Sequence, residues 1–338
     1  MSAENLTVVV TGPTGDIGRS TIRAIESSHE VGRVIGMARR PFEPADLGWT
    51  RATYRQGDVL DRDSADRLVE GADVVVHLAF IIFGGHEETR RINLEGSRNV
   101  FEAAVAANAK RLVYTSSVAA YGFHADNPQP LTEEVEPRGT ASFYYSAQKA
   151  ELEGLLREVV AGSDTDAYLF RPCIVAGPDA TTLVTEMVRS TSAGGVLRPV
   201  QRLLEAAPLI GPVLPDPGLP LQLVHHEDVA QAVRAAVLGR GSPGVYNLAA
   251  EDTLTTRDLA RELGWLSPPL PRRAVSAVAG MASRLPLLPA RMGWVNALRV
   301  PMVMDCTKAR RELDWQPQHS ARETLGETVR AAREAGVL

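Results

Sequence analysis

The chain has 338 residues, of which 44% are hydrophobic and 23% charged, and a formal net charge of −5. This length allows a large core, either in one big domain or in a domain with a smaller lobe. The slightly acidic balance offers no basic surface to a phosphate backbone, so a nucleic-acid partner is not expected.

Neither a membrane span nor a secretion signal is expected. No run is both apolar and long enough to cross a bilayer, and the first residues do not open a basic and then apolar leader. Ala274 to Val303 is hydrophobic but interrupted by arginines and prolines. We expect helices of a substrate lobe there, with membrane-surface contact as the less favoured alternative. Cys173 and Cys306 stand far apart without a zinc-type spacing, which predicts two buried thiols in the cytoplasm.

The first chemical signal is a glycine-rich stretch near the start of the chain. An apolar, β-branched run from Leu6 to Val10 leads into Gly12, Gly15 and Gly18, and an amphipathic segment follows. This pattern predicts a strand, a tight turn and a helix. Glycines let the backbone approach a pyrophosphate, and the helix N-terminus offers it free N–H groups and a positive dipole end. The expected dinucleotide-binding residues are Gly12, Thr14, Gly15, Asp16, Ile17 and Gly18.

Strands and helices alternate through the first half of the chain. The hydrophobic patterns predict strands at residues 34–37, 52–56, 73–78, 111–115 and 167–170. They predict helices at about residues 62–69, 87–107 and 144–160. This alternation is typical of an α/β fold, a Rossmann-type doubly wound parallel sheet with helices on both faces. Ligands bind such sheets at the carboxyl ends of the strands, so the chemistry is expected there.

The pattern loosens beyond residue 177 into a region rich in proline and glycine. Order returns at residues 221–224 and 245–248, which we expect to be strands that rejoin the first domain. We therefore predict a dinucleotide-binding domain over residues 1–177, completed by those two strands. A smaller, mostly helical substrate lobe is expected from residues 178–220 and 251–338.

The end of the second strand bears on the choice of cofactor. An acidic residue there binds the ribose 2′-hydroxyl of NAD, whereas an arginine accommodates a 2′-phosphate. Here Ala38 is followed by Arg39 and Arg40, which favours NADP(H) over NAD(H). The alternative is that both arginines lie on a solvated loop, which leaves the choice open. Asp58 and Val59 end the third strand and are expected beside the adenine, although an Asp that caps the next helix fits the same pattern.

A candidate catalytic group follows the fifth strand. Tyr145 and Lys149 are four residues apart in an expected helix, so their side chains share one face. A phenol has a pKa of about 10, and a nearby ammonium favours the phenolate. Such a tyrosine can exchange a proton with a carbinol oxygen while hydride moves to or from a nicotinamide. A hydroxyl of Ser116 or Ser117, at the end of the fifth strand, can hold the same oxygen.

With these motifs in this order, the sequence resembles an extended short-chain dehydrogenase/reductase of the NAD-dependent epimerase/dehydratase group. The resemblance covers nearly the whole chain and includes the glycine stretch and the segment from Tyr145 to Lys149. Its other landmarks are Gly57-Asp58-Val59, His77-Leu78-Ala79, Ile92 to Gly96, Thr115-Ser116-Ser117, Tyr121-Gly122, Arg171-Pro172, Gly177-Pro178, Val224 to Ala230, Tyr246-Asn247-Leu248 and Arg311 to Pro317.

The resemblance implies roles for individual residues. It makes Ser117, Tyr145 and Lys149 the catalytic triad, with Lys149 also bonded to the nicotinamide ribose. It implies further cofactor contacts from Leu78, Ala79, Asn93, Pro172 and Ile174. It makes the stretch from His225 to Asp228 a structural strand-to-helix corner, so no metal is expected. The helices at residues 87–107 and 144–160 resemble the dimer interface of the family, which implies a homodimer.

The loop after the fourth strand bears on the substrate. Phe80, Ile82 and Phe83 are apolar and lie at the active-site edge, so they suit a small hydrophobic molecule better than a sugar. The alternative is that they pack under the lobe. Ser116, Ser117 and Tyr145 complete the expected substrate contacts. The second half of the chain shows no clear array of arginines that matches the diphosphate grip of nucleotide-sugar enzymes. The arginines considered are Arg198, Arg202, Arg272, Arg273 and Arg291.

Three functions remain. The favoured one is an NADP(H)-dependent oxidoreductase that reduces a ketone or oxidises a secondary alcohol. The second is a nucleotide-sugar epimerase or dehydratase with tightly bound NAD. The third is a non-catalytic dinucleotide sensor, against which the presence of Ser117, Tyr145 and Lys149 argues.

Overall fold

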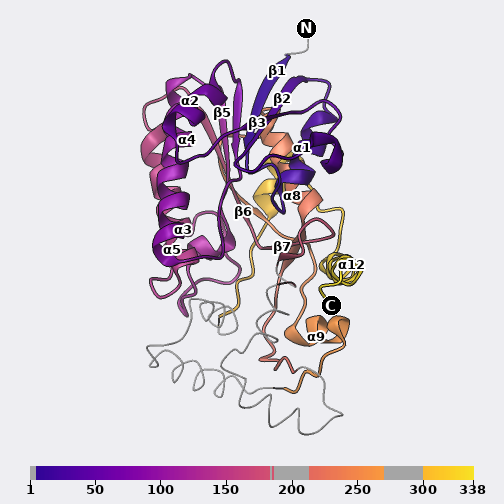
Figure 1. Ribbon diagram of the computed structural model, residues 1–338. Helices are drawn as coiled ribbons and strands as arrows, with labels where there is room; N and C mark the ends of the chain where they lie inside the picture. Colours follow the sequence, from indigo (N-terminus) through magenta and orange to yellow (C-terminus); the bar gives the residue numbers. More distant parts are fainter. Residues whose placement is uncertain (1–4, 183–184, 186–212, 270–299) are drawn as a thin grey trace.

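Seven parallel strands form the centre of the computed structural model, which describes residues 5–182, 185, 213–269 and 300–338 (Figure 1). The strand order is β3-β2-β1-β4-β5-β6-β9, so the chain starts inside the sheet at β1 and winds outward first in one direction and then in the other. The strands are β1 (Leu6–Thr11), β2 (Val31–Ala38), β3 (Thr53–Gln56), β4 (Val74–His77), β5 (Arg111–Thr115), β6 (Asp166–Pro172) and β9 (Gly244–Leu248). The predicted doubly wound, Rossmann-type sheet is confirmed.

Both faces of the sheet are buried, because successive side chains of a strand point to opposite sides. In β1, Val8 and Val10 belong to one hydrophobic core and Val9 to another. In β4, Val74 and Val76 face the first core and the intervening valine the second. The side chains of a continuous β-branched run are therefore buried on both faces of the sheet, as in other parallel sheets.

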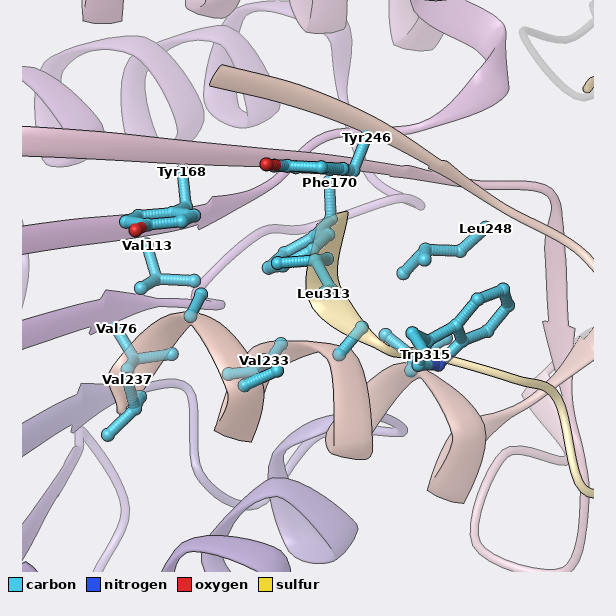
Figure 2. Close-up of a cluster of buried hydrophobic side chains, with 14 of the residues drawn as sticks. Val76, Val113, Tyr168, Phe170, Val233, Val237, Tyr246, Leu248, Leu313 and Trp315 are labelled. Atoms are coloured by element: carbon cyan, nitrogen blue, oxygen red, sulfur yellow. The ribbon is translucent and has the colours of Figure 1, made fainter. Parts of the chain in front are cut away.

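Helices cover each face (Figure 1). On one face α1 (Gly18–Glu26) packs against α8 (His226–Val237). On the other, α4 (Gly96–Ala106) lies between α2 (Arg62–Val69) and α5 (Tyr144–Val160). Figure 2 shows the first core, where residues of α8 meet strand residues and a C-terminal segment that contributes a buried tryptophan. The side chains labelled there are Val76, Val113, Tyr168, Phe170, Val233, Val237, Tyr246, Leu248, Leu313 and Trp315.

The helix expected at residues 87–107 has three parts. Residues His86–Arg90 form α3, and α4 begins at Gly96. Between them Arg91–Glu95 form a π-helical turn that holds Asn93, whose side chain is completely buried. Such a widened turn inserts one extra residue into a helix and is common at functional sites. The inserted turn lies beside the loop that follows β4, because Asn93 is hydrogen-bonded to the backbone of Ile81.

Only one of the two later strands rejoins the main sheet. β9 pairs with β6, but β8 (Leu223–His225) pairs with β7 (Ile174–Ala176) in a separate two-stranded parallel sheet. Leu223 packs in a third core with α9 (Thr256–Leu263) and α12 (Ala321–Glu334). The apolar run near residue 223 is therefore buried on both sides, Leu223 among these helices and Val224 in the first core, and the extent of the predicted first domain stays a prediction.

The C-terminal region also completes the first core. α11 (Thr307–Leu313) packs on β9 and α8. Much of the predicted substrate lobe, including most of Ala274 to Val303, lies outside the described residues, so its extent stays a prediction. The arginines at positions 198, 202, 272, 273 and 291 lie there too. No helix among the described residues is long and apolar enough to span a membrane.

Candidate active site

The carboxyl ends of β1, β2, β4, β5 and β6 meet at one edge of the sheet. The Gly12 N–H donates to the Met37 carbonyl (3.3 Å), and the Leu78 N–H donates to the Thr11 carbonyl (3.1 Å). On the other side, the Ser116 N–H donates to the Phe170 carbonyl (2.7 Å). The glycine turn, the arginines after β2, the loop after β4 and the serines after β5 are thus brought together along this edge.

The three glycines of the turn have different reasons to be glycine. Gly12 has a φ of +71°, and a Cβ there would lie 2.7 Å from the Ala79 nitrogen. A Cβ at Gly18 would overlap the backbone of Gly12 and Pro13. At Gly15 the nearest atom to a Cβ is 3.5 Å away, and φ is not positive. The fold therefore requires the first and third glycines, whereas at the second a Cβ would meet only the Gly12 carbonyl at ordinary contact distance. The fold gives no reason for that glycine, and a pyrophosphate close to the turn would give one.

The N-terminus of α1 has the features of an anion site. Its N-cap residue, Ile17, makes no side-chain cap, and its first turn has no acidic residue. The Arg19 N–H reaches the Gly15 carbonyl (3.4 Å), but the positive end of the helix dipole still favours a phosphate. The Arg19 guanidinium donates to the Thr14 carbonyl (3.3 Å) and stabilises the turn. Beside it, burial raises the pKa of the Asp16 carboxyl, while a hydrogen bond with Thr182 acts in the opposite direction.

Arg39 and Arg40 are exposed at the end of β2, beside the glycine turn. Their carbonyls are held by Gln56 (Nε2 to O, 3.1 Å) and Tyr54 (Oη to O, 3.3 Å), so the backbone is fixed while the guanidiniums extend outward. Within the described ranges neither guanidinium has an ion-pair partner. Both are available to a phosphate, but the same geometry suits a solvated loop.

Asp58 and Val59 lie at the end of β3 as expected. The Leu60 N–H donates to Asp58 Oδ1 (3.0 Å), which closes a local turn. The N-cap of α2 is a different residue, Asp61. Val59 is buried, and its carbonyl accepts from Asn99 Nδ2 (2.9 Å). The adenine contact remains a prediction.

Lys149 lies at the centre of the site. Its ammonium donates to the Thr115 carbonyl (3.0 Å) and to the Tyr114 hydroxyl (3.3 Å), and it lies 3.8 Å from the centroid of the Phe80 ring. The side chain is almost fully buried. Burial lowers the pKa of the Lys149 ammonium to about 7, although Glu153 partly opposes this. Its charge is therefore poised to change near neutral pH.

Tyr145 lies one turn before Lys149, on the same face of α5. Burial raises the pKa of the Tyr145 phenol, and a side-chain hydrogen bond with Ser117 acts against that rise. Ser117 also accepts from the Ala119 N–H (3.2 Å), which fixes the serine hydroxyl at the start of the short helix Val118–Tyr121. The structure thus brings together the three residues that were predicted as catalytic.

Ser116 faces the other way. Its hydroxyl donates to Glu153 Oε1 (2.6 Å), and Glu153 forms a completely buried ion pair with Arg171 (2.5 Å). The geometry favours Ser117 over Ser116 as the catalytic serine and gives the substrate contact predicted for Ser116 no support. Sequence reasoning missed the Glu153–Arg171 pair. The available signal was a carboxylate four residues beyond Lys149, on the same helix face.

His77 is a second buried residue that the sequence analysis did not single out for chemistry. Its Nδ1 lies 2.7 Å from the Thr11 hydroxyl and its Nε2 2.8 Å from the Ser97 hydroxyl. Burial lowers the pKa of His77 to about 3, and the charge of Lys149 adds to the effect. The neutral imidazole therefore links β1 and α4 behind the site.

The loop after β4 is fixed from two sides. Asn93 accepts from the Ile81 N–H (2.8 Å) and donates to the Ile81 carbonyl (2.9 Å) and to Gln148 Oε1 (2.8 Å). The Tyr144 hydroxyl donates to the Ile82 carbonyl (2.7 Å). Asn93 acts on this loop, so the cofactor contact predicted for it remains a prediction. Gln148, which the sequence analysis did not single out, completes the clamp.

The other predicted contacts lie at the same edge. Leu78 and Ala79 follow β4 against the glycine turn. Pro172 ends β6, and Ile174 opens β7 as a half-buried residue. Phe83, like Phe80 and Ile82, is partly buried.

His225, Glu227 and His319 each bring one potential ligand atom within 4.8 Å of the others. The two imidazole rings are stacked, with centroids 3.8 Å apart and planes inclined by 19°. Ring lone pairs lie in the ring planes, so stacked rings do not converge on one ion. His225 Nδ1 accepts from the Glu227 N–H (3.2 Å), and its Nε2 lies 3.2 Å from Glu327. This hydrogen-bonded corner fits the structural role expected for the stretch, and the absence of a metal stays a prediction.

Comparison with known proteins identifies the family that the sequence matches. The sequence model of the NAD dependent epimerase/dehydratase family matches residues 8–249. Among curated relatives, sterol demethylase protein B of Methylococcus capsulatus is 29% identical over 179 residues, which are 51% of this chain and 52% of that protein.

Solved structures support the same fold. The crystal structure of gox2253 has a TM-score of 0.74 and 22% identity, and the match covers 99% of this chain and 100% of that one. The dTDP-glucose 4,6-dehydratase DesIV of Streptomyces venezuelae, solved with NAD and TYD bound, has a TM-score of 0.70 and 22% identity. That match covers 97% of each chain.

Proposed function

The chain belongs to the NAD dependent epimerase/dehydratase family of enzymes, the extended short-chain dehydrogenases/reductases, and from that premise we propose that it is an NADP(H)-dependent oxidoreductase. Its reaction is the reduction of a ketone or the oxidation of a secondary alcohol in a small hydrophobic molecule. The observation that carries the proposal is the meeting of Tyr145, Lys149 and Ser117 beside a glycine turn whose middle glycine the fold does not require.

The residues divide the chemistry among them. A bound nicotinamide supplies hydride exchange. The Ser117 hydroxyl orients the carbinol or carbonyl oxygen of the substrate, and the Tyr145 hydroxyl gives or takes the proton at that oxygen. The buried Lys149 ammonium favours the phenolate form, because a nearby positive charge in a dry site acts strongly.

The preference for NADP(H) rests on Arg39 and Arg40. Both guanidiniums are exposed beside the glycine turn, and no carboxylate ends β2. A guanidinium fork suits a phosphate and gains little from a neutral ribose. Titrations of intrinsic fluorescence with NADPH and NADH test this. We expect NADPH to bind more tightly, and Arg39→Ala to weaken NADPH without weakening NADH. Tighter binding of NADH by the wild type contradicts the proposal.

The preference for a hydrophobic substrate rests on Phe80, Ile82 and Phe83, which the Asn93 and Tyr144 hydrogen bonds fix at the active-site edge. The similarity to a sterol demethylase protein over half of the chain is consistent with it. A panel of alicyclic ketones and alcohols, assayed by the change in NADPH absorbance at 340 nm (the usual wavelength for this assay), tests substrate class.

A nucleotide-sugar epimerase or dehydratase is the second candidate. The fold similarity to DesIV supports it. Such an enzyme returns the hydride within one cycle and leaves the external nicotinamide pool unchanged. Net oxidation of added NADPH with a ketone therefore excludes this candidate, and conversion of a nucleotide sugar without net change in NADPH excludes the first.

We further propose that the enzyme is a cytoplasmic homodimer whose partners are a small-molecule substrate and a second copy of itself, with neither nucleic acid nor membrane. The two free, buried cysteines are compatible with a reducing compartment. The helical segments over residues 87–107 and 144–160, which line an open groove, are the proposed dimer surface.

A further inference from the structure

Phe80 occupies a fixed position over the catalytic lysine. The next residue, Ile81, is paired through both backbone groups with Asn93, and the carbonyl of Ile82 accepts from Tyr144. These bonds anchor the loop just beyond Phe80 to the π-helical turn and to α5. The Phe80 ring therefore has little freedom to leave the site, because its backbone is clamped on the C-terminal side.

The Phe80 ring contacts both members of the Tyr145–Lys149 pair. Its centroid lies 3.8 Å from Lys149 Nζ, and its edge meets the Tyr145 ring with centroids 5.6 Å apart and planes inclined by 85°. The Lys149 ammonium has three N–H groups. Two are directed at the Thr115 carbonyl and the Tyr114 hydroxyl, so the aromatic face takes the place of a third, solvent partner. An aromatic face attracts a cation but, unlike water, does not screen its charge.

Within the part of the chain that the structure describes, no carboxylate forms an ion pair with Lys149. From α5, Glu153 acts on it at a distance, but that carboxylate is committed to Arg171 and Ser116. The neutral His77 of β4 lies behind it. The other titratable groups described near Lys149 are the phenols of Tyr114 in β5 and Tyr145 in α5.

We propose that Phe80 is a positioning residue for the Tyr145–Lys149 pair: its ring excludes water from the Lys149 ammonium, so that the lysine charge acts on Tyr145 and not on solvent. The inference rests on the proposed function, because it assigns Phe80 a part in the same proton transfer. It separates Phe80 from Ile82 and Phe83, whose expected role is contact with substrate alone.

The test is a titration of Lys149 in the full chain without dinucleotide. The sequence holds three lysines, at positions 110, 149 and 308, so protein labelled with [ε-13C]lysine gives three signals, assigned by Lys110→Arg and Lys308→Arg. In the wild type we expect a midpoint for Lys149 near 7, in line with its lowered pKa. In Phe80→Ala we expect the pKa of Lys149 to rise by about one unit or more towards the ordinary lysine value, since water enters.

Phe80→Leu should move the Lys149 midpoint below that of the wild type. Leucine keeps water out but removes the aromatic face, so the charged form loses its attraction and the burial remains. Ile82→Ala is the matched control in the same loop, because it keeps the carbonyl that Tyr144 binds, and it should leave the midpoint unchanged. If Phe80→Ala does not fold, as judged by the Lys110 and Lys308 signals, Phe80→Val replaces it.

Two results overturn the inference: a wild-type midpoint near 10, or equal midpoints in the wild type and Phe80→Ala. If Phe80 only supports the loop, neither Phe80→Ala nor Phe80→Leu changes the midpoint of Lys149. The titration uses no substrate or nicotinamide, so its outcome is independent of the NADPH assays above, and failure of the proposed function is recognised separately.

Discussion

At the scale of single residues, the site depends on one hydroxyl whose neighbours set its chemistry. The Tyr145 ring packs against Phe80 and Phe143, with centroids 5.6 Å and 5.7 Å away. Only the phenolic oxygen is available for proton transfer. The ring and the hydroxyl can therefore be separated by a substitution that keeps the packing.

Tyr145→Phe should abolish turnover and leave dinucleotide binding largely intact. Removal of a general acid–base group typically lowers the rate by about 10²–10⁴-fold. Steady-state rates and NADPH fluorescence titrations measure the two effects. The control is Tyr168→Phe, which removes a hydroxyl bonded to the Gly241 carbonyl outside the site and should retain most of the activity. Wild-type turnover by Tyr145→Phe contradicts the assignment.

The buried Glu153–Arg171 pair makes a prediction about stability. Both side chains are 1% exposed, and Glu153 also accepts from Ser116. Glu153→Ala leaves the guanidinium buried without its partner, which typically costs about 3–5 kcal/mol in the free energy of unfolding. Glu251 pairs with Arg310 away from this helix, and these side chains are 73% and 37% exposed. Glu251→Ala should therefore cost about 0–1 kcal/mol.

Urea denaturation of the two variants measures this contrast. Equal losses of stability would show that the inner pair is not specially protected from water.

The sequence predicted residue types at the site better than their contacts. Tyr145 and Lys149 could be placed on one face because helix periodicity is local. The bond from Ser116 to Glu153 joins residues 37 positions apart, and the cover that Phe80 forms over Lys149 joins residues on different elements. Contacts of this kind depend on how a loop and a helix pack, and local pattern carries no information about that.

At the scale of elements, the glycine turn separates what the fold needs from what a ligand needs. Gly12 has a positive φ and lies against the backbone of Ala79, whereas Gly15 has neither constraint. If only the fold constrained position 15, a small side chain would be tolerated there.

Gly15→Ala should therefore preserve stability and weaken cofactor binding. A glycine-to-alanine change at a compatible position stabilises by about 0.4–1 kcal/mol, but the added methyl group enters the space above the turn. We expect the affinity for NADPH to fall by roughly tenfold, or about 1.4 kcal/mol.

Gly12→Ala is the contrasting variant. It should lower the free energy of unfolding by about 1–3 kcal/mol or more, because it strains the backbone. Thermal unfolding and NADPH titration of both variants give the comparison. Unchanged affinity in Gly15→Ala would show that no ligand approaches that residue.

Two elements show the limits of prediction from pattern at this scale. The helix at residues 87–107 was expected as one piece, but a π-helical turn interrupts it at Arg91–Glu95. Such a turn does not change the apolar period enough to be seen in the sequence. For β8 the sequence predicted only a strand of the first domain, because apolar residues do not specify a pairing partner; β8 pairs with β7, apart from the main sheet.

At the scale of the whole molecule, one outer face has a groove and a helix glycine that contacts within the chain do not explain. An open groove of about 580 Å³ lies along α3, α4 and α5, lined by Glu87, Arg90, Arg91, Leu94, Glu95, Arg98, Glu151, Gly154, Leu155 and Glu158. It carries both signs of charge, as a surface that pairs with a copy of itself requires. Gly154 lies within α5, where glycine costs about 1 kcal/mol relative to alanine. A Cβ there would meet no described atom within 4 Å.

The proposed homodimer explains that glycine, because a helix without a side chain at this point lets a second backbone approach closely. We expect light scattering to give about twice the chain mass of 36.4 kDa. Gly154→Arg should give a monomer of unchanged or slightly higher thermal stability per chain, since arginine favours the helix and has room in the isolated subunit. Gly326→Arg, at a helix glycine of α12 away from this groove, should leave the dimer intact. A Gly154→Arg protein that still has twice the chain mass would place the dimer surface elsewhere and leave the glycine to be explained by another partner on α5.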